Sequence, residues 1–151
     1  MPKRLAIDLD DVCIALETAP DAELRWYLDA QTGATLLVND EYDPSDIDGP
    51  TRDEIDAAPE RYLAIPAAPP EQALTDMREF VAALEDPQLR QSLEMALDGR
   101  GPARRFKTAL GHLPEQRDRW HAWKRARTEG RAQTWLAGAG LEAAGPGKPR
   151  P

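Results

Sequence analysis

The sequence predicts an α+β fold with an N-terminal helix, a three-stranded antiparallel sheet built on a hairpin, and a C-terminal bundle of about four helices. Two observations lead to this prediction. Apolar residues alternate with polar or mixed ones over residues 24–38, which is the period of a β-strand. From residue 70 onward, apolar residues recur at helical spacing, and prolines and glycines divide that part of the chain into segments.

The alternating stretch is interpreted as the hairpin. Gly33 can adopt a positive φ without steric cost, so we expect a type I turn that closes through a glycine bulge. That turn would pair Leu28 with Leu36. It would also pair Trp26 with Val38, so that the large apolar residues share one face of the sheet. Neighbouring helices would cover that face.

Short elements flank the hairpin. Asp8 is a suitable N-cap for a helix that ends before Pro20, because apolar residues follow it at helical spacing. Further along, Thr51 and Glu54 have the spacing of a capping box, which predicts a short helix. Residues 61–66 are then expected to form the third strand, paired along one edge of the hairpin.

Four helices are expected after residue 70, packed on the sheet. The first carries a strong apolar stripe. Asp86 caps the second and Gly99 ends it, Pro102 lies in the first turn of the third, and Pro114 begins the fourth. We predict one domain over residues 1–136 and a disordered Gly/Ala/Pro-rich tail over residues 137–151.

Composition limits the compartment and the means of stabilisation. A chain of 151 residues can bury a core large enough to fold without a metal ion or a disulfide. Cys13 is the only cysteine, which excludes an intramolecular disulfide and fits a reducing compartment. The sequence contains no run long and apolar enough to span a bilayer, so we expect a cytoplasmic protein that does not bind membranes.

Charge is distributed unevenly along the chain. Residues 1–99 hold 7 Lys and Arg against 23 Asp and Glu, a net charge of −16. Residues 100–132 hold 10 against 3, a net charge of +7. The two parts could attract each other within one fold, or the basic part could bind a separate partner.

The basic segment from Arg100 to Arg131 is the best candidate surface. Lys and Arg neutralise phosphates, and exposed aromatic rings stack on unpaired bases, so one hypothesis is binding of RNA or single-stranded nucleic acid. The competing interpretation places the interleaved aromatic residues, Phe106 and the tryptophans, in the core. The candidate anion-binding or partner-binding residues are Arg104, Arg105, Lys107, Arg119, Lys124 and Arg127.

The function favoured by the sequence is a non-enzymatic protein-interaction or regulatory module, with an unknown protein or a second copy as its partner. We find no catalytic constellation and predict no cofactor. His112 and His121 lack the accompanying cysteine or carboxylates of a metal site, so no metal is expected. Cys13 lies on the apolar side of its helix, as a buried and inert thiol would.

One short motif suggests a different chemistry. Residues 7–12, Ile-Asp-Leu-Asp-Asp-Val, resemble the first motif of the haloacid dehalogenase superfamily. That resemblance implies a phosphatase in which Asp8 is the nucleophile and Asp10 the acid/base, with magnesium. The superfamily fold needs further parallel strands and a late acidic pair, and the chain after Val38 lacks the corresponding patterns.

The order of several segments is similar to that in the bacterial Uncharacterised Protein Family 0158. The resemblance implies that Asp8 to Asp11 begin a helix and not a phosphatase site. Because that family has no established activity, the resemblance supplies no catalytic residues. The matching segments are Ile7–Val12 with Ala15–Glu17, Tyr27–Asp29 with Thr32–Gly33, Pro59–Leu63 with Ile65–Pro66, and Arg104–Lys107 followed by Trp120 and Trp135–Leu136.

Overall fold

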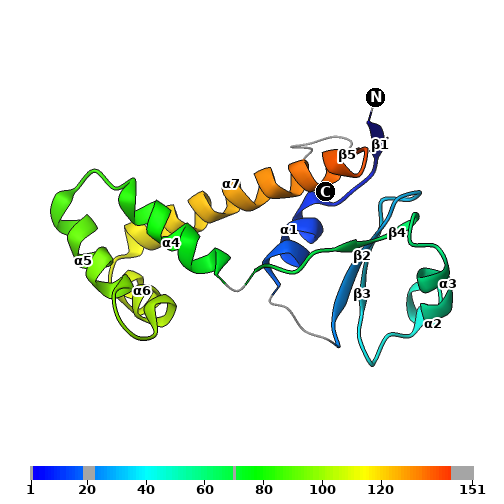
Figure 1. Ribbon diagram of the computed structural model, residues 1–151, viewed down its shortest axis with the longest axis horizontal. Helices are drawn as coiled ribbons and strands as arrows, with labels where there is room; N and C mark the ends of the chain where they lie inside the picture. The colour runs from blue at the N-terminus through cyan, green and yellow to red at the C-terminus, as the bar shows by residue number, and fades with distance from the viewer. Residues whose placement is uncertain (1, 19–22, 70, 144–151) are drawn as a thin grey trace. The chain divides into compact units, whose positions relative to one another are not determined.

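The computed structural model describes residues 2–18, 23–69 and 71–143, and it confirms the predicted α+β fold (Figure 1). A three-stranded antiparallel sheet has the order β3-β2-β4, and a two-stranded sheet pairs β1 with β5. The elements are β1 (Lys3–Leu5), α1 (Leu9–Glu17), β2 (Arg25–Asp29), β3 (Thr35–Val38), α2 (Pro44–Ile47), α3 (Arg52–Ala57), β4 (Tyr62–Ile65), α4 (Gln72–Ala82), α5 (Pro87–Leu97), α6 (Pro102–Gly111), α7 (Pro114–Gly138) and β5 (Leu141–Ala143).

The chain divides into two compact units. The α/β unit comprises residues 1–68 and 128–151, and the helical unit comprises residues 69–127. Of the predicted disordered tail, residues 144–151 lie outside the described part of the chain. Its first residues belong to the end of α7 and to β5.

The register of the hairpin differs from the predicted one by a single residue. Trp26 lies opposite Leu37, and Leu28 lies opposite Thr35, so the predicted pairing of Leu28 with Leu36 and of Trp26 with Val38 is wrong. The reason is the length of the turn. The amide of Asp29 donates to the carbonyl of Ala34 at 2.8 Å, which leaves a four-residue loop that closes at Gly33 with a φ of 84°.

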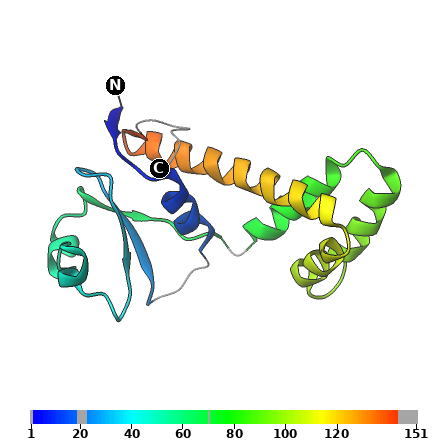
Figure 2. The ribbon, with the colours of Figure 1, turned by 180° about the vertical axis from the view of Figure 1, so that it is seen from behind.

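Because a shift of one residue moves every side chain to the other face, the sheet has apolar side chains on both faces. On one face, Leu28 and Ile65 pack with Val12 of α1 and Leu136 of α7. Figures 1 and 2 show α1 and the C-terminal end of α7 close to each other from both sides. On the other face, a second cluster consists of Leu36, Val38, Ile55 and Tyr62, with Tyr27, Tyr42 and Ala58 packed against it.

The predicted helix starts of the α/β unit are confirmed. The Asp8 carboxylate accepts from the amides of Asp10 at 2.9 Å and Asp11 at 3.4 Å, and so caps α1. Thr51 and Glu54 form the expected capping box of α3. Strand β4 pairs with β2 along one edge of the hairpin, as predicted.

The strands β1 and β5 were not predicted. They pair in parallel, with Lys3 opposite Leu141 and Leu5 opposite Ala143. Each has three residues, which is too short for a period-two pattern to be seen. Gly33 lies against the segment after β1, since a Cβ on it would be 2.8 Å from the carbonyl oxygen of Ala6.

The helical unit has its own apolar core. Asp86 caps α5 and Pro102 lies in the first turn of α6, as the sequence predicted. The prediction that all four helices pack on the sheet is wrong, because α4, α5, α6 and the first part of α7 bury their apolar stripes against one another. The residues of this core are Met77, Phe80, Val81, Leu84, Leu93, Leu97, Phe106, Leu110 and Trp120. None of the described helices is long and apolar enough to cross a membrane.

Candidate functional site

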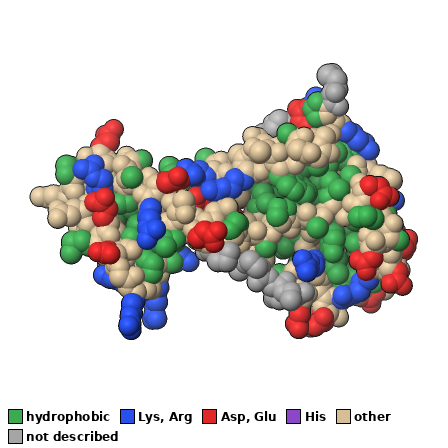
Figure 3. Space-filling view, in the orientation of Figure 1, with side chains coloured by type: hydrophobic (Ala, Val, Ile, Leu, Met, Phe, Trp, Pro, Cys, Tyr) green, Lys and Arg blue, Asp and Glu red, His purple; other side chains and the backbone are tan. Residues whose placement is uncertain are grey.

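The six candidate cations all lie in the helical unit. Three are on α6 and three on α7. Figure 3 shows Lys and Arg side chains projecting from the surface over α6. Their surroundings decide which of them can contact a ligand.

Arg127 binds acidic side chains of its own unit. Its Nε lies 3.4 Å from a carboxylate oxygen of Asp76, which is buried, and its Nη2 forms an ion pair with Glu79. Its guanidinium also lies 4.6 Å from the centre of the Trp123 ring, within the range of a cation–π interaction. Arg127 therefore fastens α7 to α4, and its charge is largely used within the protein.

Arg105 and Arg119 are also engaged locally. Arg105 donates to the backbone carbonyls of Asp98 and Met95, so it satisfies acceptors that the end of α5 leaves free. Arg119 pairs with Glu115 one helical turn earlier, at 3.7 Å. Both side chains are solvent-exposed, so these contacts are weak but compete with a ligand.

Arg104 and Lys107 are the candidates most accessible to a ligand. Both are exposed and, three residues apart, lie on one face of α6. Neither side chain forms a hydrogen bond or ion pair with another described residue. Lys124 is half-buried on α7 and has a partner of its own. Of the six candidate cations, Arg104 and Lys107 therefore form a small patch on α6, whereas the other four have partners within the protein.

Phe106 and Trp120 of the basic segment belong to the core of the helical unit, and Trp123 is partly buried against that core. Phe106 is fully buried and Trp120 is 4% exposed. Phe80 contacts both rings edge-on, with centroid distances of 6.4 Å to Phe106 and 5.4 Å to Trp120. These rings therefore offer no platform on which bases could stack.

The aspartates near the start of the chain act as helix residues. The Asp8 carboxylate is used in the cap of α1, and Asp10 and Asp11 lie in the first turn, where negative charge complements the helix dipole. Among the described residues, no group of three or more His, Cys, Asp or Glu side chains could hold a metal ion.

Cys13 and the histidines lie where the sequence suggested. Cys13 is buried in the core, and burial, together with Glu129, Glu17 and Asp8, raises the pKa of its thiol to about 11. A thiol with that pKa stays protonated near neutral pH and is a poor nucleophile. His112 and His121 are exposed on the helical unit.

A buried ion pair in the α/β unit was not predicted. Asp29 is 6% exposed, and both of its oxygens accept from Arg61, from Nε and Nη2 at 3.0 Å each. One oxygen also accepts from the amides of Gln31 and Thr32. Burial raises the pKa of the Asp29 carboxyl, but the bonds from Arg61 and the two amides outweigh it and lower the pKa below its ordinary value.

The same ion pair fixes the turn of the hairpin to the start of β4. The sequence held one signal for this arrangement. Asp29 precedes Gln31 by two residues and Thr32 by three, in a turn that closes at a glycine, and this spacing is typical of an Asx turn. Nothing in the spacing indicated that Arg61, thirty-two residues later, would complete it.

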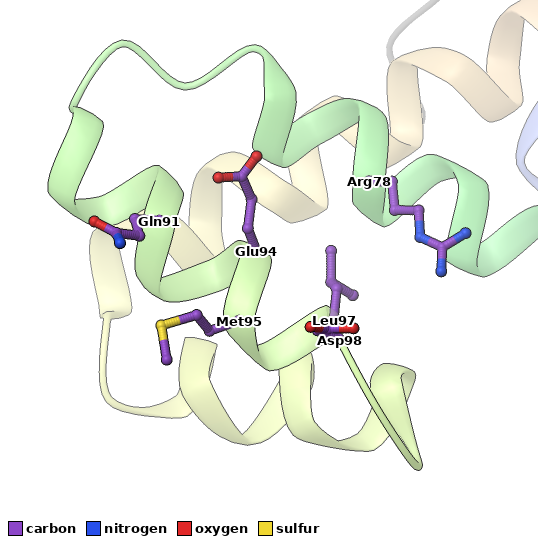
Figure 4. A pocket seen from close by; sticks show the side chains of 6 residues that line it. All are labelled: Arg78, Gln91, Glu94, Met95, Leu97 and Asp98. Carbon is purple, nitrogen blue, oxygen red and sulfur yellow. The ribbon is translucent and has the colours of Figure 1, made fainter.

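A depression of about 540 Å³ lies beside α4 and α5 in the helical unit. Its lining side chains do not converge on one point, as Figure 4 shows: Arg78 extends from α4, whereas Glu94 and Met95 extend from α5 in other directions. Met95 is 64% exposed. This arrangement lacks the convergent polar groups of an active site.

A second depression, of about 490 Å³, lies in the α/β unit along β4. Its lining is mainly apolar and comes from both sides of that strand. The residues are Tyr27, Ile55, Asp56, Pro59, Tyr62, Leu63, Ala64, Trp135 and Ala139. We call it the β4 groove.

Comparison with known proteins agrees with the resemblance seen in the sequence. A profile of the uncharacterised protein family UPF0158 matches residues 3–144. A UPF0158 protein of Pseudomonas aeruginosa is 31% identical over 132 residues, which cover 87% of this chain and 82% of that protein. No solved structure matches the chain significantly. On the strength of this profile match and this relative, the chain belongs to the uncharacterised protein family UPF0158.

Proposed function

We propose that this chain is a non-enzymatic protein-interaction module. The observation that carries the proposal is the use of the candidate cations: Arg127, Arg105 and Arg119 contact acidic or carbonyl groups of their own unit. Of the aromatic rings that could have stacked on bases, Phe106 and Trp120 are buried, and Trp123 and Trp135 are partly buried against apolar clusters. Both features favour a protein partner over a nucleic acid.

The charges of the two units support the same proposal. The α/β unit holds 8 Lys and Arg against 18 Asp and Glu, a net charge of −10. Figure 3 shows acidic side chains gathered over α2 and α3. A surface of that sign repels polyanions and attracts basic protein surfaces.

No catalytic role is included in this proposal. Asp8, the nucleophile that the dehalogenase motif would require, is bonded to two backbone amides of α1. A magnesium-dependent phosphatase assay on the unmodified protein and on Asp8→Asn tests this part. We expect equal background rates, and turnover that only the unmodified protein shows would contradict it.

The interaction role is tested by capture from the native host with and without nuclease. We expect a protein partner that is retained in stoichiometric amount after nuclease treatment. Recovery that disappears with nuclease, or no stoichiometric partner, contradicts the proposal.

Binding of a labelled single-stranded RNA over a range of salt concentrations tests the competing function. For binding through phosphates, log K falls with log salt by about 0.7 for each phosphate neutralised. We expect no such binding near physiological salt. Salt-dependent binding that Arg104→Glu combined with Lys107→Glu abolishes would instead assign the patch on α6 to nucleic acid.

A further inference from the structure

We infer that the outer edge of β4 is a docking site for an extended, basic segment of a partner protein, which adds a fourth strand to the sheet. This inference rests on the proposed interaction role and names its site. Strand addition uses backbone hydrogen bonds for affinity and side-chain pockets for specificity.

The backbone of β4 has groups free to receive such a strand. In the order β3-β2-β4, strand β4 is at the edge of the sheet. The amide of Ala30 donates to the carbonyl of Arg61 at 2.7 Å, so with the observed register Leu63 and Ile65 also point their backbone groups toward β2. The alternate residues, Tyr62 and Ala64, point theirs outward.

Only one of those outward groups is used. The amide of Tyr62 donates to the carbonyl of Ala58 at 2.9 Å. The carbonyl of Tyr62 and both backbone groups of Ala64 form no hydrogen bond with another described residue. The edge therefore offers one unpaired donor, the amide of Ala64, and two acceptors, the carbonyls of Tyr62 and Ala64. Residues two apart on a strand direct their backbone groups to the same side, and an added strand would pair with these groups.

The β4 groove supplies walls on both sides of this edge. Its lining includes Trp135 of α7, which packs in the cluster on one face of the sheet, and Ile55 of α3, which packs in the cluster on the other face. Ala64 itself is exposed and lies in the lining. Side chains that alternate along an added strand would therefore contact apolar surface above and below the sheet.

Charge identifies the occupant. Among the described residues that line the groove, Asp56 is the one that is charged, and Glu60, which follows the lining residue Pro59, is exposed. The whole α/β unit has a net charge of −10, so edge-to-edge pairing of two copies would bring two strongly acidic bodies together. A strand that carries Lys or Arg among apolar residues is attracted instead.

The test uses the full chain and a fluorescein-labelled peptide of alternating Val and Lys, followed by fluorescence anisotropy. Ala64→Pro removes the outward amide but no bond to β2, because the amide of Ala64 points away from that strand. Proline is tolerated at such an edge position. Its matched control is Leu37→Pro, which places proline at the corresponding outward position of β3, the other edge of the same sheet. We expect about 10-fold weaker binding for Ala64→Pro and unchanged binding for Leu37→Pro.

A second pair of variants tests the charge. Asp56→Lys reverses the acidic residue of the groove, and Glu41→Lys makes the same change at an exposed residue that does not line the groove. We expect Asp56→Lys to weaken binding of the Val-Lys peptide and to strengthen binding of a Val-Glu peptide. Glu41→Lys is expected to have a smaller effect on both.

Hydrogen exchange locates the bound strand directly. The amide of Ala64 is expected to exchange about 10-fold more slowly in the complex, because it becomes a ladder donor. No peptide binding, equal losses for Ala64→Pro and Leu37→Pro, or protection confined to β3 or to the helical unit would overturn the inference. Concentration-dependent self-association that Ala64→Pro abolishes would also overturn it, since the occupant would then be a second copy.

Failure of this inference differs from failure of the proposed function. If Ala64→Pro captures the same host partner with unchanged affinity, the edge of β4 is not the site although the interaction role stands. If neither the unmodified protein nor the variants capture a partner, the interaction role itself is wrong.

Discussion

The α/β unit and the helical unit are assembled in different ways. In the α/β unit, Lys3–Leu5 pairs with Leu141–Ala143, so both ends of the described chain meet in one sheet. The helical unit is a continuous segment, residues 69–127, whose helices follow one another in the chain. Most contacts of the helical unit are therefore local in sequence, whereas the α/β unit depends on distant segments.

The units also differ in charge and in how they bury an acidic residue. The α/β unit has a net charge of −10, and the helical unit, with 11 Lys and Arg against 9 Asp and Glu, has +2. Asp29 is held by two short bonds from Arg61, whereas Asp76 lies 3.4 Å from Arg127, which it shares with Glu79. We expect the first pair to contribute more to stability than the second.

The largest expected effect comes from the core of the helical unit. Phe106→Ala removes a fully buried ring that Trp120 contacts edge-on, and is expected to lower the free energy of unfolding by about 4 kcal/mol. Hydrogen exchange should show the loss of protection chiefly in α4, α5 and α6. Leu28→Ala is the matched variant of the α/β unit, where protection should instead fall in β2. Equal loss in both units for either variant would contradict the division into two units.

The next effect concerns Asp29. Asp29→Asn leaves Arg61 without its negatively charged partner. Because Arg61 is about one-third exposed, we expect the free energy of unfolding to fall by about 3 kcal/mol at neutral pH, which is near the low end for buried ion pairs. Chemical denaturation at several pH values measures it. A decrease in the free energy of unfolding smaller than that typical of solvent-exposed ion pairs would show that the Asp29–Arg61 pair does not stabilise the fold.

The direction of the pH dependence follows from the lowered pKa of Asp29. Because the folded state holds this pKa below the ordinary value of about 3.9, the unfolded state binds the proton more readily. The stabilisation is therefore present above that value and is lost as the pH falls through the folded pKa. In Asp29→Asn this part of the acid dependence should be absent, and an unchanged acid profile would contradict the assignment.

Local chemistry made much of both units predictable from the sequence. Asp8, Thr51 and Asp86 were assigned as caps because each type of side chain satisfies free amides within three residues of itself. The apolar stripes of α4 and α5 follow directly from helical spacing. These features depend on neighbours in the chain, and so a sequence is sufficient to find them.

Features that depend on distant neighbours were missed. The register of the hairpin depends on the length of the loop that closes at Gly33, to within one residue, and a pattern of alternating residues does not specify that length. The pairing of β1 with β5, and of Asp29 with Arg61, joins segments whose proximity only the fold creates. For the same reason the sequence did not indicate which acidic side chain would pair with Arg127, since it is the fold that brings Asp76 of α4 to it.

The ion pair of the helical unit should give a smaller effect than that of the α/β unit. Arg127→Met keeps the aliphatic stem but removes the contacts to Asp76, Glu79 and the Trp123 ring, and we expect a loss of about 2 kcal/mol. Denaturation at neutral pH measures it beside Asp29→Asn. A loss larger than that of Asp29→Asn would reverse the ranking of the two pairs.

The smallest expected effects come from the helix caps, which compare the units at exposed positions. Thr51→Ala removes the acceptor for the amide of Glu54 in the α/β unit and is expected to cost about 1 kcal/mol. Asp86→Ala removes the acceptor for the amides of Gln88 and Leu89 in the helical unit, with a similar expected cost. Thr51→Ser keeps the hydroxyl and is expected to restore most of the lost stability.

The same two cap variants also test the β4 groove. Because α3 borders the groove through Asp56, Thr51→Ala should weaken binding of the Val-Lys peptide, whereas Asp86→Ala should not. Equal binding losses for the two cap variants would show that the groove has no special dependence on α3.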